Sequence, residues 1–220
     1  MPHLLIADDH PLFRTALHHA ALAALGAEAV VAEAADLAAA MAAMAADPDI
    51  DLVLLDLHMP GSRGLSGLAA LRGQFPAVAV IVVSAHDEPR VVRRALDYGA
   101  AGYITKSAGH DDIAAAIRTV LDCGEWVPPR LARQVAELPP NPQDSALAAR
   151  LARLTEQQYR VLELVAEGLL NKQIADRLAI QERTVKAHVT AIFEKLGVHN
   201  RTQAGILLRS LDLADPAGML

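Results

Sequence analysis

Short apolar runs alternate with longer stretches rich in Ala and Leu over the first 123 residues. The runs have strand length and predict five strands, at 4–7, 29–32, 52–55, 78–83 and 101–104. The longer stretches predict five helices, at 12–25, 36–46, 66–75, 90–98 and 111–121. Strands that are apolar throughout are typical of a parallel sheet with helices on both faces. The pattern therefore predicts an α/β domain over residues 1–123, with a flavodoxin-like (βα)5 arrangement.

Prolines interrupt this pattern between residues 124 and 150. Pro128-Pro129, Pro139-Pro140 and Pro142 bracket one stretch, 130–138, that has a helical pattern. Proline ends helices and stiffens extended chain. We therefore expect 124–150 to be a semi-rigid linker that contains one short helix.

The patterns over residues 151–220 are helical. Thr155 and Gln158 have the spacing of a capping box, which starts a first helix that ends at Gly168. Asn171 is expected to cap a second helix at 172–178. Two more helices are expected, at 182–196 and 202–213. A short helix joined to a longer one by a tight turn predicts a small all-α helix-turn-helix domain.

Composition and charge narrow the possible functions. No apolar run reaches the roughly 18 residues that a membrane span needs, and no basic export signal precedes the first apolar run. The single cysteine excludes an internal disulfide, so we expect a cytoplasmic protein. Residues 1–125 carry 8 Lys and Arg against 16 Asp and Glu, a balance of −8, whereas residues 126–220 carry 12 against 10, a balance of +2. The second half is therefore the better partner for nucleic acid.

Polar side chains follow four of the five predicted strands. Asp8-Asp9 follow the first strand, Asp56 the third, Ser84 the fourth and Lys106 the fifth. Each alone would be an ordinary cap or a solvated charge, but the carboxyl ends of parallel strands meet at one edge of a sheet. There the Asp56 carboxylate can attack a phosphoryl group, Asp9 and Asp56 with a backbone carbonyl can hold Mg²⁺, and Lys106 can pair with phosphoryl oxygens. The residues predict a magnesium-dependent phosphorylation site, with Ser84 able to bond a further phosphoryl oxygen.

The third helix of the second domain is amphipathic. At 100° per residue, its apolar stripe consists of Val185, Val189, Ile192 and Leu196. The opposite face carries Arg183, Lys186, Ala187, Thr190 and Glu194. Small and basic residues suit the major groove, where Lys186 can reach phosphates or guanine. An isolated helix of this kind is more often a solvated surface, but the preceding helix, the tight turn and the basic shift favour DNA binding.

Residues 3–122 resemble the receiver domain of bacterial two-component response regulators, and the run from Asp8 to Arg14, Asp-Asp-His-Pro-Leu-Phe-Arg, resembles its NarL/FixJ branch. The resemblance implies that Asp56 is the phosphoacceptor of a sensor histidine kinase or a small phosphodonor. It also implies Mg²⁺ as cofactor, held directly by Asp9 and Asp56, through water by Asp8, and by the backbone carbonyl of His58. It assigns the roles of switch hydroxyl, switch aromatic and phosphate-binding lysine to Ser84, Tyr103 and Lys106.

Residues 154–204 are similar to the LuxR-type helix-turn-helix, through the runs Asn171-Lys172-Gln173-Ile174-Ala175 and Lys195-Leu196-Gly197-Val198. In that family the last helix serves dimerisation. One departure is Gln181, where a serine usually caps the recognition helix, a loss of about 1 kcal/mol. The resemblance places Lys186, Ala187 and Thr190 against bases. It places Asn171, Lys172, Thr184 and His188 near phosphates.

The leading hypothesis is a DNA-binding transcriptional response regulator, not an enzyme, which acts as a homodimer on promoter DNA when Asp56 is phosphorylated. A regulator of the same fold that responds to another signal or to a protein contact remains the alternative. An aspartyl phosphatase would need a second acid where His58 stands. A flavin carrier would need a phosphate-binding loop rich in Gly, Ser or Thr where Asp8-Asp9 stand. A quorum-sensing regulator would need a ligand-binding domain rich in aromatic residues. The sequence excludes these three classes.

Overall fold

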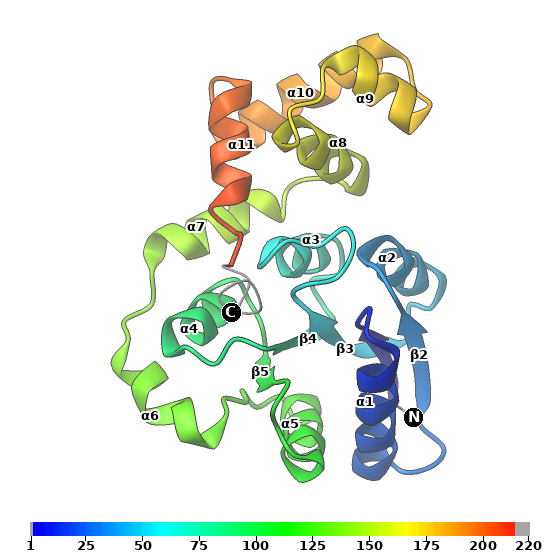
Figure 1. Ribbon diagram of the computed structural model, residues 1–220, viewed down its shortest axis with the longest axis vertical. Coiled ribbons are helices and arrows are strands. Elements are labelled where there is room, and N and C mark those ends of the chain that lie inside the picture. The colour runs from blue at the N-terminus through cyan, green and yellow to red at the C-terminus, as the bar shows by residue number, and fades with distance from the viewer. Residues whose placement is uncertain (1, 214–220) are drawn as a thin grey trace.

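One parallel sheet forms the centre of the N-terminal lobe, with its strands in the order β2-β1-β3-β4-β5 (Figure 1). The structure is a computed structural model that describes residues 2–213. The strands are β1 (His3–Ala7), β2 (Val30–Ala34), β3 (Ile50–Asp56), β4 (Ala79–Ser84) and β5 (Gly102–Thr105). They alternate with α1 (Pro11–Leu25), α2 (Leu37–Ala46), α3 (Ser66–Gln74), α4 (Pro89–Asp97) and α5 (His110–Leu121). The flavodoxin-like (βα)5 prediction is confirmed, with the second strand displaced from its predicted bounds.

Helices cover both faces of the sheet. α1 and α5 pack on one face, where Leu17 and Ile117 join Leu54 of β3 in a buried core. α2, α3 and α4 cover the other face, where Val53 of β3 and Leu68 of α3 are buried. Alternate residues of β3 therefore enter two different cores, which explains why this strand is apolar from Leu52 to Leu55.

The segment predicted as a linker with one helix contains two, α6 (Pro129–Glu137) and α7 (Pro142–Leu151). The prediction missed α7 because proline was taken only as a helix breaker. Pro142 occupies the first helical position, where its missing N–H costs nothing, and the Asn141 side chain accepts a bond from Gln143 N at 3.0 Å. Leu131 of α6 and Leu151 of α7 are buried. Because α6 packs on α4, and α7 on α3 and α4, this segment is not a free spacer.

Up to residue 213, the C-terminal lobe is formed by the helices α8 (Glu156–Ala166), α9 (Asn171–Leu178), α10 (Glu182–Leu196) and α11 (Arg201–Arg209). The capping box is confirmed, since Gln158 N donates to Thr155 Oγ1 at 3.3 Å and Thr155 N donates to Gln158 Oε1 at 3.1 Å. The predicted cap at Asn171 is wrong. Leu170 occupies the N-cap of α9, and its N–H donates to Gln173 Oε1 at 2.8 Å, so a side chain inside the helix supplies the acceptor.

The start of α10 offers a test of the capping argument. Gln181 occupies the N-cap position in an extended conformation, but its side chain makes no capping bond. A serine hydroxyl there can accept a bond from the first turn, so Gln181→Ser should raise the free energy of unfolding by about 1 kcal/mol. Thr155→Ala removes an existing cap and should lower it by a similar amount. Thermal unfolding of both variants measures the effects, and an unchanged midpoint for Gln181→Ser would contradict the argument.

Candidate functional site

A lysine bridges two buried carboxylates at the carboxyl end of the sheet. Asp8 follows β1 and Asp56 ends β3, and both residues are fully buried. Lys106 follows β5 and places its Nζ 2.9 Å from Asp8 Oδ2 and 2.8 Å from Asp56 Oδ2. Three strand ends thus bring one ammonium and two carboxylates together, as the strand order requires.

The environment of Lys106 keeps it charged. Burial by itself would lower the pKa of Lys106, but its hydrogen bonds to Asp56 and Asp8 outweigh burial and hold that pKa above the ordinary lysine value. The Phe13 ring lies 5.1 Å from Nζ and adds a cation–π contact. Because the pKa of Lys106 is raised in the folded protein, the stability that this charged lysine contributes to the fold is fully present at neutral pH. It is lost only as the pH rises through the raised pKa.

His10 joins the cluster, a position to which the sequence analysis gave no role. Its Nδ1 lies 2.7 Å from Asp9 Oδ1 and 3.2 Å from Asp8 Oδ1. Its backbone N–H donates to Asp8 Oδ1 at 2.7 Å and so fixes the turn between β1 and α1. The adjacency of His10 to the acid pair in the sequence was the available signal.

The donor atoms of this cluster fit a divalent cation. One ligand atom from each of Asp8, Asp9, His10 and Asp56 lies within 4.8 Å of the others. Asp9 Oδ1 is buried in this cluster beside His10 Nδ1. Three carboxylates supply the hard oxygen atoms that Mg²⁺ prefers.

The remaining predicted residues of this site lie at the end of β4, in β5 and in the loop after β3. Ser84 ends β4, is fully buried, and accepts a bond from His86 N at 3.2 Å through its Oγ. The backbone N–H of His58 donates to Asp56 Oδ1 at 3.1 Å. Tyr103 lies wholly inside the protein and donates its hydroxyl proton to the His86 carbonyl at 2.9 Å. The Tyr103 ring therefore already lies inside the protein in this structure, and its role as switch aromatic stays a prediction.

The outer face of α10 is open to solvent. Val185, Ile192 and Leu196 are buried, as the apolar stripe predicted, and Val189 is partly buried. Lys186 pairs with Glu182 at 2.9 Å, one helical turn earlier. The residues of the face opposite the apolar stripe are all exposed: Arg183, Lys186, Ala187, Thr190 and Glu194.

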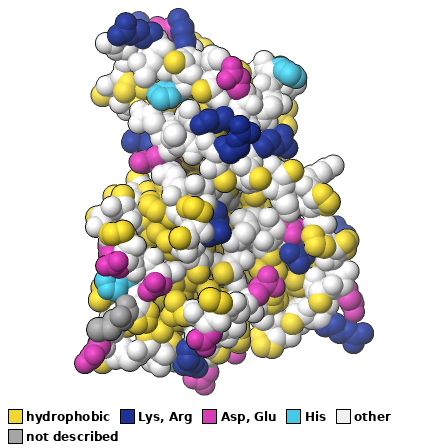
Figure 2. Space-filling view, turned by 180° about the vertical axis from the view of Figure 1, so that it is seen from behind, with side chains coloured by type: hydrophobic (Ala, Val, Ile, Leu, Met, Phe, Trp, Pro, Cys, Tyr) yellow, Lys and Arg dark blue, Asp and Glu magenta, His cyan; other side chains and the backbone are white. Residues whose placement is uncertain are grey.

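The four residues expected near phosphates differ in exposure. Lys172 is exposed, whereas Asn171, Thr184 and His188 are half-buried. Asn171 Oδ1 accepts a bond from Arg201 Nη2 at 3.2 Å, so Arg201 adds a cation beside α9 that the sequence analysis did not assign. Figure 2 shows Lys and Arg side chains gathered on the C-terminal lobe, while most Asp and Glu side chains on that face belong to the N-terminal lobe.

Two family models match the chain. The model described as "Response regulator receiver domain" matches residues 4–118, and the one described as "Bacterial regulatory proteins, luxR family" matches residues 152–208. The chain is 44% identical over 212 residues to a glycerol metabolism activator of Pseudomonas putida, with 95% of this chain and 96% of the relative covered. It is 37% identical over 204 residues to the nitrate/nitrite response regulator NarP of Escherichia coli (strain K12), with 93% of each covered.

Solved structures share the fold. The chain is similar to the RcsB response regulator of Salmonella typhimurium, with a TM-score of 0.57, 24% identity, and coverage of 94% of this chain and 99% of that chain. The protein therefore belongs to the NarL/FixJ-type response regulators, in which a receiver domain is joined to a LuxR-type helix-turn-helix. It is a DNA-binding transcriptional regulator, and members of this family are not enzymes.

The bridge between the two buried acids can be tested by removing its cation. Lys106→Gln leaves Asp8 and Asp56 facing each other, and breaking a buried ion pair in this way should lower the free energy of unfolding by roughly 3 kcal/mol at pH 7. Lys186→Gln breaks a surface ion pair and, as a control, should cost less than about 1 kcal/mol. Urea unfolding in EDTA measures both. Equal losses in the two variants would contradict the role of Lys106.

Proposed function

We propose that Asp56 accepts a phosphoryl group from a sensor histidine kinase or a small phosphodonor, and that this modification activates DNA binding. The observation that carries the proposal is the Lys106 ammonium, 2.8 Å from Asp56 Oδ2. An oxygen of Asp56 attacks phosphorus, the bond from phosphorus to the donor breaks, and the donor leaves with the electron pair. Lys106 then pairs with an oxygen of the new acyl phosphate.

Mg²⁺ is the cofactor we propose for this site. Asp9 and Asp56 would ligate it directly, Asp8 through water, and the backbone carbonyl of His58 would complete the protein ligands. The proximity of the three carboxylates supports this set. When bound, the ion would neutralise negative charge on the phosphoryl oxygens.

Ser84 and Tyr103 have separate proposed roles beside the phosphoryl group. Ser84 would donate its hydroxyl proton to a phosphoryl oxygen, while its Oγ accepts the bond from His86 N. Tyr103 would remain buried and hold the loop between β4 and α4 through the His86 carbonyl. Phosphorylation would therefore act on the loop around Ser84 without a large movement of the Tyr103 ring.

The C-terminal lobe would bind promoter DNA as one half of a homodimer, with one recognition helix α10 in each half-site. Exposure of the outer face of α10 supports this arrangement. Lys186, Ala187 and Thr190 would face the bases. The residues proposed to lie along the phosphates or beside them are Asn171, Lys172, Arg183, Thr184 and His188.

The domain bounds we propose are 1–123 for the receiver and 151–220 for the helix-turn-helix domain, with the segment 124–150 as a structured connection that contains α6 and most of α7. The last seven residues of the second domain lie outside the described residues. Among the helices of residues 2–213, none has the length and apolar character to cross a membrane. We propose a cytoplasmic location, where a kinase, Mg²⁺ and DNA are all accessible.

Asp56→Asn tests the phosphoacceptor. Incubation with acetyl phosphate and Mg²⁺ should add one phosphoryl group to the wild-type protein and none to the variant, because an amide oxygen is a poor nucleophile. Asp51→Asn, which changes an exposed acid near the other end of β3, is the matched control and should be labelled normally. Intact-protein mass spectrometry measures the product. Equal labelling of Asp56→Asn would place the nucleophile elsewhere.

Lys186→Ala tests the recognition helix. Loss of one phosphate or guanine contact should weaken binding to a two-half-site operator by about 1–3 kcal/mol per half-site and reduce the salt dependence. Arg133→Ala removes a highly exposed cation of α6, outside the helix-turn-helix, and should bind as wild type. Gel-shift titrations at one fixed salt concentration measure the affinity. If phosphorylated and unphosphorylated wild type bind equally, the regulator responds to another signal.

A further inference from the structure

His10 directs a ring nitrogen into the acid cluster at the carboxyl end of the sheet. Its Nδ1 lies 2.7 Å from Asp9 Oδ1, 3.2 Å from Asp8 Oδ1 and 3.9 Å from Asp56 Oδ2. These acids stand at the ends of β1 and β3, which are neighbours in the sheet. One imidazole nitrogen therefore faces three carboxylates.

Two other histidines of the receiver have simpler surroundings. Within residues 2–213 the rings of His3 and His18 each pair with a single acid. His3 Nδ1 lies 2.9 Å from Asp47 Oδ2, and His18 Nδ1 lies 3.0 Å from Glu33 Oε1. A single pair of this kind is an ordinary surface ion pair or hydrogen bond. The position of His10 against three acids is more than such a pair requires.

The start of α1 does not account for the orientation of the His10 ring. His10 occupies the N-cap of α1, where Ser, Thr, Asp and Asn are favoured because their side chains accept a bond from the first turn. The His10 side chain makes no capping bond. Its backbone N–H donates to Asp8 Oδ1 at 2.7 Å and so holds the residue beside the acids.

The distances in this cluster fit a shared metal ion. Ligand atoms about 2.1 Å from an octahedral ion lie about 3.0 Å apart at adjacent positions and about 4.2 Å apart at opposite ones. The distances from His10 Nδ1 to the carboxylate oxygens run from 2.7 to 3.9 Å. Because the His10 side chain is 63% exposed, it can move slightly outward and admit an ion between these atoms.

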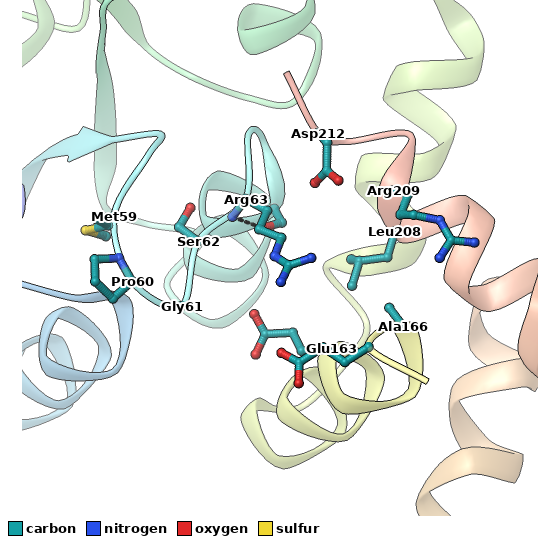
Figure 3. Close-up of a pocket in the computed structure, with 12 residues that line it drawn as sticks. Met59, Pro60, Gly61, Ser62, Arg63, Glu163, Ala166, Leu208, Arg209 and Asp212 are labelled. Atoms are coloured by element: carbon teal, nitrogen blue, oxygen red, sulfur yellow. Dashed lines mark hydrogen bonds between the residues drawn. The ribbon is translucent and has the colours of Figure 1, made fainter. Parts of the chain in front are cut away.

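This cluster has no equal in the described part of the chain. No other group of three or more His, Cys, Asp or Glu side chains in residues 2–213 gathers its ligand atoms within 4.8 Å. A cavity of about 340 Å³ between the lobes is also lined by three acids, Glu163, Glu167 and Asp212 (Figure 3). The guanidinium groups of Arg63 and Arg209 line the same cavity, so the protein itself supplies positive charge there.

A nitrogen ligand changes which ion the acid cluster prefers. Carboxylate and carbonyl oxygens suit Mg²⁺, whereas imidazole suits Ni²⁺ and Zn²⁺, and affinity for a nitrogen and oxygen ligand set rises from Mn²⁺ towards Ni²⁺. A neutral imidazole carries its proton on either ring nitrogen. Nδ1 of His10 can therefore offer a lone pair to an ion without any change in charge.

We propose that His10 is a metal ligand of this site beside Asp9 and Asp56, and that the site therefore binds a divalent transition metal such as Ni²⁺ more tightly than Mg²⁺. This inference rests on the proposed metal-dependent phosphorylation of Asp56, whose ligand set it extends. The His10 nitrogen takes a coordination position that water holds when oxygen ligands alone bind Mg²⁺. His10 thereby determines which divalent ion occupies the site when several compete.

His10→Ala in the tag-free, metal-free full-length protein is the principal test. Loss of a ligand should cost at least the roughly tenfold in affinity that loss of an outer-shell partner costs. The variant should bind Ni²⁺ at least about tenfold more weakly than wild type in calorimetric titrations, and Mg²⁺ with unchanged affinity in NMR titrations. His19→Ala removes an exposed histidine of the same helix and is the matched control, expected to bind both ions as wild type.

His10→Asn guards against a loss of structure at the start of α1. Asparagine is a favoured N-cap residue, so this variant keeps the helix start intact while it removes the imidazole nitrogen. It should show the same selective loss of Ni²⁺ affinity as His10→Ala.

Co²⁺ gives an independent readout of the ligand atom. Imidazole nitrogen is a stronger-field ligand than oxygen, so the visible d–d band of bound Co²⁺ should shift to longer wavelength in His10→Ala and stay in place in His19→Ala. A merely structural role for His10 would change the affinity for Co²⁺ and leave the band where it is.

The outcomes separate this inference from the proposed function. If His10→Ala keeps the wild-type Ni²⁺ affinity or Co²⁺ band, or loses Mg²⁺ and Ni²⁺ affinity equally, His10 is not a ligand. Labelling of Asp56 by acetyl phosphate with Mg²⁺ would then stand by itself. If Asp56 is labelled with neither ion while His10→Ala loses Ni²⁺ selectively, His10 is a ligand and the proposed role of Asp56 fails.

Discussion

The bond network of Lys106 with Asp8 and Asp56 constrains the rest of the receiver. Two fully buried carboxylates are costly unless a cation pairs with them, and Lys106 supplies that cation from the end of a third strand. β1 and β3 are neighbours, and β5 is separated from β3 by β4, so the lysine reaches across the sheet edge. A parallel sheet with its carboxyl ends at one edge brings these charges together without any long loop.

The same constraint prepares the site for chemistry. The buried acids need the Lys106 cation in the resting protein. The same cation, together with a bound metal ion, can stabilise the negative charge that a phosphoryl group brings. Lys106 supplies one positive charge there, against the three carboxylates of Asp8, Asp9 and Asp56. A change of charge at Asp56 therefore alters the balance of positive and negative charge at this edge of the sheet, to which the loop 57–65 is adjacent.

The sequence predicts those parts of the structure that depend on local pattern. Val53 and Leu54 belong to an apolar run that predicts a doubly covered strand, and the acid after it predicts the site. The capping box at Thr155 follows from spacing alone. Features that depend on pairing between distant segments could not be predicted. The short distance from Gly73 to Ala152 and the position of Tyr103 have no periodic signature, since both result from how separate elements pack.

The modest charge of the DNA-binding half bears on how the protein is switched. Residues 126–220 have a balance of +2, and Lys186, the most direct candidate for a base contact, already pairs with Glu182. Few phosphates would be neutralised by one lobe, so one lobe alone would bind weakly at physiological salt. Tight binding then requires the C-terminal lobes of two protomers on one operator. A change in the orientation of these lobes is therefore enough to control DNA binding.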